Sequence, residues 1–183
     1  MVSRLTSQKG FDLLETVLDG LLSQDIQFVL LGTGDKRYQD FLTQVALQHP
    51  AKCGARIAFD ESLARKVIAG ADMFLVPSRY EPSGLTPIYS LKYGTIPIVR
   101  ATGGLQDTIQ EFNPETGEGN GFIFGLYESQ ELLEAVVRAL TLFNDREKWA
   151  TLMKNAMAAD FSWERSAGAY LDLYQKLLVT ESP

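Results

Sequence analysis

Only one cysteine, Cys53, and one histidine, His49, occur among the 183 residues. A single cysteine excludes an internal disulfide framework and a cysteine-based metal cluster. His49 lies at the end of a polar helical pattern, where we expect it to be solvated, so no metal site is predicted. No apolar run approaches the roughly 20 residues that span a bilayer, and no signal-peptide pattern opens the chain. We therefore expect a soluble protein of a reducing compartment.

The charge balance is modestly acidic, with 17 lysines and arginines against 23 acids and a net charge of −6. This balance argues against a general nucleic-acid binder, although a local basic pocket can still bind phosphate. Hydrophobic residues at 45% and charged residues at 22% are close to the globular average, which excludes disorder. A chain of this length predicts one domain with at most a small appendage.

Short apolar runs alternate with amphipathic segments along most of the chain. We expect strands at 2–5, 26–31, 56–59, 73–76, 96–99 and 121–124. We expect helices at 14–21, 36–48, 61–69 with Asp60 as N-cap, 84–93, 129–143, 145–158 and 164–178. This alternation predicts an α/β fold, a doubly wound and mainly parallel Rossmann-like sheet. We assign residues 1–160 to this domain and 161–183 to a C-terminal helical extension.

Ligands of such sheets bind at the carboxyl ends of the strands, so the residues that follow each strand are the candidates for a site. Arg4 ends the first strand and Lys9 precedes the first long helix. Two cations on one loop are suited to a diphosphate, since arginine gives a forked contact and lysine a point charge. Taken alone, such a pair is more commonly two solvated surface cations, because exposed charges are the norm.

A turn rich in proline and glycine, 77–86, connects a strand to a helix. The backbone N–H groups of Gly84, Leu85 and Thr86 would open that helix and form an anion site without any side-chain charge. Glu81 projects from the same turn, where it would meet the part of a ligand beyond its phosphates. Its alternative role is a carboxylate that complements the helix dipole.

Gly103 and Gly104 follow the strand at 96–99 and would permit close backbone approach to a ligand, although the pair is also compatible with a simple turn. No G-x-G-x-x-G fingerprint follows the first strand. The segment Gly32-Thr33-Gly34 is too short to be one.

Several segments together resemble one family, the bacterial glycogen synthases and plant starch synthases. The resemblance begins at Val2-Ser3-Arg4-Leu5-Thr6-Ser7-Gln8-Lys9-Gly10 and continues through Tyr80-Glu81-Pro82-Ser83-Gly84-Leu85-Thr86. It extends over 91–100, Thr102-Gly103-Gly104-Leu105 and Phe161-Ser162-Trp163. The matching segments occur in order along nearly the whole chain, which is more specific than any one motif.

The resemblance implies the nucleotide-sugar-binding half of a retaining GT-B glycosyltransferase. Such enzymes transfer glucose from ADP-glucose, or UDP-glucose in some relatives, to the non-reducing end of an α-1,4-glucan. By the same resemblance, Arg4 and Lys9 hold the diphosphate, and Glu81 contacts the glucose hydroxyls and supports positive charge at the sugar. Phe59 corresponds to an aromatic residue beside the base. The remaining residues assigned to donor binding are Gly84, Leu85, Thr86, Tyr89, Gly103 and Gly104.

Two substitutions depart from the wider family pattern. Tyr89 stands where related transferases have a second glutamate, which fits the glycogen and starch synthase branch. Ser83 stands where family members often have cysteine, a sterically mild change. The family needs no metal and no cofactor besides its donor ADP-glucose, whose product is ADP.

The family's catalytic unit also has a first domain, which supplies the acceptor groove, and this chain has no counterpart of it. Met1 directly precedes a shortened first strand, so we expect a fragment or a domain-sized product that binds nucleotide but transfers little. In the intact enzyme its last helix, 163–178, would pack towards the first domain. In the isolated chain it would either fold onto its own domain or expose the apolar residues Leu171, Tyr174 and Leu178. We expect an α-glucan partner through that domain, no nucleic-acid or membrane partner, and a bacterial cytoplasmic or plastid stromal location.

Two alternatives remain open at this point. Since fold alone does not establish function, the chain can be a non-catalytic Rossmann-like interaction module, which would bind no nucleotide. It can also be a related retaining transferase with another donor, which would bind a different base or sugar.

Overall fold

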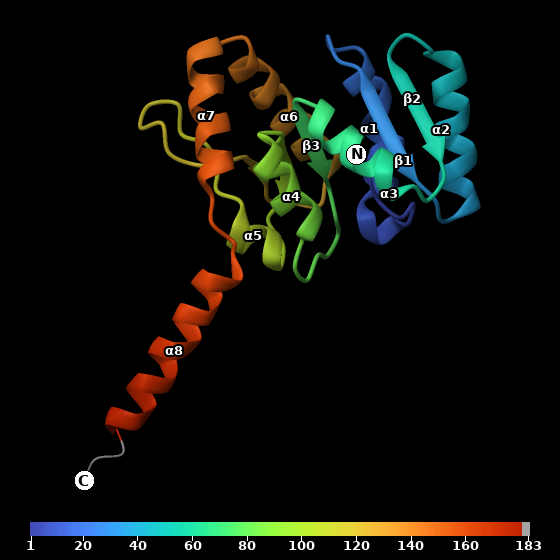
Figure 1. Ribbon diagram of the computed structural model, residues 1–183. Coiled ribbons are helices and arrows are strands. Elements are labelled where there is room, and N and C mark those ends of the chain that lie inside the picture. Colours follow the sequence, from blue (N-terminus) through green and yellow to red (C-terminus); the bar gives the residue numbers. More distant parts are fainter. Residues whose placement is uncertain (181–183) are drawn as a thin grey trace.

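The computed structural model describes residues 1–180, which form an α/β fold (Figure 1). The strands are β1 (Phe28–Gly32), β2 (Cys53–Ile57), β3 (Met73–Val76), β4 (Ile96–Arg100) and β5 (Phe122–Phe124). The helices up to β4 are η1 (Ser7–Lys9), α1 (Phe11–Leu22), α2 (Lys36–Gln48), α3 (Glu61–Gly70) and α4 (Leu85–Tyr93). Those after it are α5 (Gly104–Thr108), α6 (Ser129–Phe143), α7 (Arg146–Ala158) and α8 (Trp163–Thr180).

All strand pairings are parallel, as the alternation of strands and helices predicts. The hydrogen bonds form two ladders, β1 with β2 and β3–β4–β5. The N-terminal segment pairs in parallel with β1 through two isolated bridges, Val2 with Leu31 and Leu5 with Gly34. The first strand expected at 2–5 is therefore reduced to two bridges.

Helices cover the sheets and join the two ladders. Helix α1 packs against α6, which also contacts β4 and β5, while α4 packs on β3 and β4 and touches α3 and α7. Residues 96–99 of β4 are all buried. Since successive side chains of a strand point to opposite faces, both faces of this strand are covered.

Several expected boundaries are wrong by one to three residues. The strand expected at 26–31 is Phe28–Gly32, and the helix expected at 14–21 is Phe11–Leu22. Strand β2 is Cys53–Ile57, so the strand expected at 56–59 begins three residues and ends two residues too late. The chain turns away because Asp60 caps α3, accepting a hydrogen bond from the Leu63 N–H at 2.8 Å. Phe59 thereby falls in the turn, with 83% of its surface exposed. The expected turn at 102–105 instead leads into helix α5.

Helix α8 projects away from the rest of the chain (Figure 1). Its large apolar side chains are exposed, and they are Trp163, Tyr170, Leu171, Leu173, Tyr174, Leu177 and Leu178. Of the two arrangements expected from the sequence for this helix, the structure has the one that exposes its apolar residues. None of the helices in residues 1–180 is both long and apolar enough to cross a membrane.

The backbone nitrogen of Met1 donates a hydrogen bond to the carbonyl oxygen of Val29 at 2.7 Å, which adds to the pairing of the N-terminal segment with β1.

Candidate functional site

The predicted site residues lie on loops that follow parallel strands. Residues 33–35 follow β1, 58–60 follow β2, 77–84 follow β3 and 101–103 follow β4. The carboxyl ends of parallel strands share one edge of a sheet, and this edge is where α/β folds bind ligands. The residues predicted from the sequence therefore gather at the edge where this fold class binds ligands, and their contact with a ligand stays a prediction.

A cavity of about 250 Å³ lies between the N-terminal segment, the end of β1 and the start of α3. Three of the predicted residues line it together, Arg4, Phe59 and Thr86. Gly32 forms part of the cavity wall. Only a glycine allows the N-terminal segment to approach β1 here, because a Cβ on residue 32 would lie 1.9 Å from the carbonyl oxygen of Ser3. The cavity joins an exposed aromatic ring to a cation, a combination suited to a base with an attached phosphate.

Lys9 and Glu81 form an ion pair through Lys9 Nζ and Glu81 Oε2. Their side chains are largely buried, with 18% and 14% of their surfaces exposed. The hydroxyl of Ser78 also donates to Glu81 Oε2, at 3.2 Å. The sequence predicted Lys9 and Glu81 as site residues but gave no reason to expect direct contact. Ser78 is fully buried and is a residue that sequence reasoning missed.

The loops that carry this pair touch along their backbones. Gly10 has a left-handed φ of 84°, and a Cβ there would lie 2.1 Å from the carbonyl oxygen of Pro77. The Arg79 N–H donates to the carbonyl oxygen of Gln8 at 2.8 Å. Only glycine permits this approach, so Gly10 fixes Lys9 beside the loop after β3.

Helix α4 starts at this loop and presents its amino end to the site. Gly84 is the N-cap, with φ 75°, and no side chain caps the helix. The first N–H groups of a helix have no hydrogen-bond partner within the helix, so those of Leu85 and Thr86 can donate to an anion. Tyr89 lies one turn further along α4 and is exposed.

Gly103 and Gly104 support the turn that carries Glu81. The Gly104 N–H donates to the carbonyl oxygens of Glu81 and Pro82, at 3.0 and 3.2 Å. A Cβ on Gly103 would lie 2.2 Å from the carbonyl oxygen of Glu81. The close approach expected of these glycines is therefore made to the protein's own backbone, and their contact with a ligand stays a prediction.

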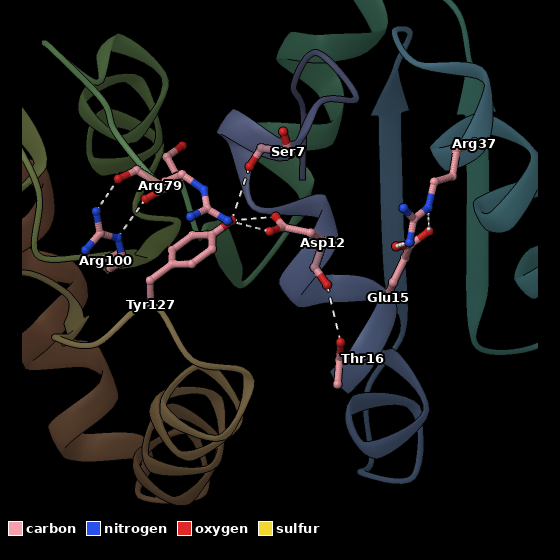
Figure 2. A network of polar contacts seen from close by, with 9 residues as sticks. Ser7, Asp12, Glu15, Thr16, Arg37, Arg79, Arg100 and Tyr127 are labelled. Atoms are coloured by element: carbon pink, nitrogen blue, oxygen red, sulfur yellow. Dashed lines mark hydrogen bonds and ion pairs between the residues drawn. The ribbon is translucent and has the colours of Figure 1, made fainter.

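A polar network beside this turn, shown in Figure 2, was not predicted. Arg79 forms an ion pair with Asp12 at 2.7 Å, and its guanidinium lies 4.0 Å from the centre of the Tyr127 ring. Burial, followed by the hydrogen bond to Asp12, raises the pKa of Tyr127. Arg100 donates to the carbonyl oxygen of Ser78 at 2.9 Å. Asp12 and Tyr127 are 115 residues apart, so no local pattern indicates their contact.

Metal ligands do not gather in the part of the chain that the structure describes. Among residues 1–180, no group of three or more histidine, cysteine, aspartate or glutamate side chains is placed to hold a metal ion. Positive charge at this edge comes from Arg4, Lys9 and the amino end of α4, with Arg79 and Arg100 beside them.

Residues 1–156 match the family described as glycosyl transferases group 1. The chain is 52% identical over 176 residues to a glycogen synthase of Fervidobacterium nodosum, which covers 96% of this chain and 36% of that protein. It is 50% identical over 183 residues to a glycogen synthase of Koribacter versatilis, covering all of this chain and 38% of that protein. The chain thus spans little more than a third of the length of these curated relatives.

The fold is similar to that of the catalytic domain of starch synthase IV from Arabidopsis thaliana, bound to ADP and acarbose. The TM-score is 0.84 at 35% identity, covering 96% of this chain and 37% of that one. The predicted fold class, one Rossmann-like half of the GT-B type, is confirmed.

We predict that Gly103→Ala destabilises the chain by roughly 2 kcal/mol or more, because φ is 50° there and the new Cβ would overlap the Glu81 carbonyl. Urea unfolding measures the change. Gly54→Ala is the control, since a Cβ at that exposed strand position meets nothing within 4 Å. Equal stability of the two variants would mean that Gly103 does not constrain the turn.

Proposed function

The chain belongs to the glycosyl transferases group 1 family, and we propose that it is the donor-binding domain of a glycogen or starch synthase. The reaction proposed is transfer of glucose from ADP-glucose to the non-reducing end of an α-1,4-glucan, with retention at the anomeric carbon. The similarity to glycogen synthases along 96–100% of this chain supports the choice of reaction.

The observation that carries the proposal is the arrangement of three features around one strand edge. The cavity beside Phe59 would take the nucleoside, and Arg4 lies on its wall. Lys9 and the amino end of α4 would take the diphosphate. Departure of the nucleotide builds negative charge on the diphosphate. Fixed cations and N–H groups therefore stabilise the transition state more than the bound substrate, which lowers the barrier.

Glu81 is proposed to contact the glucose hydroxyls and to support positive charge at the sugar. The Ser78 hydroxyl and the Lys9 ammonium both contact its carboxylate, and the Gly104 N–H holds its backbone. A carboxylate held by two side-chain contacts on a fixed backbone is preorganised, which is what charge stabilisation in a transition state requires. In this chain without nucleotide, Lys9 neutralises the carboxylate that would otherwise be buried alone.

The acceptor glucan is proposed to bind to a part of the synthase that this chain does not contain. Transfer needs both substrates held in one closed cleft, so the chain alone should bind the donor and transfer little glucose. We propose residues 1–160 as the donor-binding domain and residues 161–183 as an extension whose helix α8 packs its apolar face on the acceptor-binding domain. The last three residues of this extension, 181–183, lie outside the described residues. Its compartment, bacterial cytoplasm or plastid stroma, stays a prediction.

We predict that the chain binds ADP with a dissociation constant in the micromolar to millimolar range, and that Arg4→Ala and Lys9→Ala each weaken binding about tenfold or more. Calorimetric titration with ADP measures this. Lys148→Ala is the control, because Lys148 is a half-exposed cation on α7 that pairs with Asp145. Unchanged affinity in both site variants would contradict the proposed diphosphate contacts.

We predict that Glu81→Gln lowers turnover at least a hundredfold in a synthase that carries this domain, by analogy with removal of one preorganised charge. ADP binding to the chain should stay equal or become tighter, because Lys9 loses its competing carboxylate. Glucose incorporation and calorimetry measure the two effects. Parallel losses of turnover and of ADP affinity would assign Glu81 a structural role instead.

A further inference from the structure

We propose that Asp12, Arg79 and Tyr127 are positioning residues, which set the spacing between Lys9 and Glu81. We call these three residues the bracket. Its effect on ligand binding rests on the proposed function, because it presumes that Lys9 holds the β-phosphate. The existence of the bracket as a spacer between two loops does not depend on that function.

The bracket spans the same two loops as the Lys9–Glu81 pair. Asp12 lies three residues after Lys9, in the first turn of α1, and Arg79 lies two residues before Glu81. The Arg79 guanidinium donates to Asp12 Oδ2 at 2.7 Å. Any shift of one loop against the other therefore has to break both ion pairs or move them together.

Tyr127 holds this ion pair in place from the loop after β5. Its ring lies under the Arg79 guanidinium at 4.0 Å, and Figure 2 shows its hydroxyl directed at Asp12 and Ser7. The hydroxyl is within hydrogen-bond distance of Asp12 Oδ1 and lies 3.1 Å from the Ser7 carbonyl oxygen. The raised pKa of Tyr127 keeps the hydroxyl protonated, so it remains a donor.

Arg100, at the end of β4, fixes the other side of Arg79. It donates to the carbonyl oxygens of Ser78 and Arg79 and lies 5.4 Å from the Tyr127 ring centre. The backbone just before Glu81 is thus held by a strand, and the side chain of Arg79 by a helix and a loop. The Arg79 side chain is 57% exposed and that of Asp12 31%, so the resistance of this ion pair to displacement comes from its shared contacts with Tyr127 and Arg100 rather than from burial.

None of the bracket residues lines the cavity beside Phe59. In the described structure their side chains contact one another and the Ser7 carbonyl, and not the side chains of Lys9 or Glu81. Their influence on a ligand would therefore pass through the position of these two residues. A displacement of about 1 Å in such a pair is enough to weaken a preorganised contact strongly. A purely structural role would change stability but leave ligand discrimination unaltered.

A matched control exists on the same helix. Arg37 and Glu15 form an ion pair between α2 and α1, with nitrogen–oxygen distances of 3.0 and 2.6 Å. This pair is also drawn in Figure 2, on the side of α1 towards α2. Arg37→Gln therefore removes an arginine–carboxylate contact of α1 without touching the loop after β3.

The first test is hydrogen exchange of the chain without nucleotide, in Arg79→Gln, Tyr127→Phe and Arg37→Gln. We expect faster exchange in both 6–10 and 79–84 for the two bracket variants, and no change there for Arg37→Gln. Tyr127→Phe removes only one hydroxyl, so it keeps the test valid if Arg79→Gln fails to fold. Unchanged exchange in Tyr127→Phe, or the same pattern in Arg37→Gln, would overturn the bracket as a spacer.

The second test compares ADP with AMP, which lacks the β-phosphate. Arg79→Gln should weaken ADP binding about fivefold or more and leave AMP binding within about twofold, and it should add little to Lys9→Ala in the double variant. Equal losses for ADP and AMP, or additive losses in the double variant, would overturn an action through Lys9. If the unmodified chain binds neither nucleotide, the proposed function and the proposed effect of the bracket on ADP binding both fail. Hydrogen exchange then still tests whether the bracket fixes the spacing of the two loops.

Discussion

The site depends on the contact between two loops that are about 70 residues apart in the sequence. The loop before α1 carries Lys9 and the loop after β3 carries Glu81. Gly10 lets their backbones touch at Pro77, and the parallel arrangement of the strands brings both loops to one edge of the fold. This contact sets where Lys9 lies relative to Glu81 and to the amino end of α4, whose Thr86 also lines the cavity.

The same contact explains the electrostatics of the site. Two largely buried charges of opposite sign neutralise each other where a single one would carry a large desolvation cost. Under the proposed function, a diphosphate bound to Lys9 would compete with Glu81, and the carboxylate released in this way would become available to a sugar. The proposal therefore predicts that phosphate binding changes the state of the carboxylate.

Local patterns in the sequence predicted the elements well but not what lies between them. Helix α2 and strand β3 have the predicted bounds, because their apolar periodicity and flanking residues are local signals. The start of β2 was missed because Cys53-Gly54-Ala55 is not a run of large apolar or β-branched residues, although Asp60 was correctly expected as the cap of α3. The link from Asp12 to Tyr127 connects residues 115 apart, so only the folded chain shows it. The predicted roles of Arg4, Lys9 and Glu81 in a reaction remain predictions.

The most direct test of the central claim is a crystal structure of the chain with bound ADP. The account predicts the adenine in the cavity beside Phe59, the β-phosphate at Lys9 and the amino end of α4, and Lys9 released from Glu81. ADP bound elsewhere, for example in the polar cleft between Gly117 and Arg165, would contradict it. An intact Lys9–Glu81 pair beside a bound diphosphate would contradict the link between phosphate binding and the carboxylate.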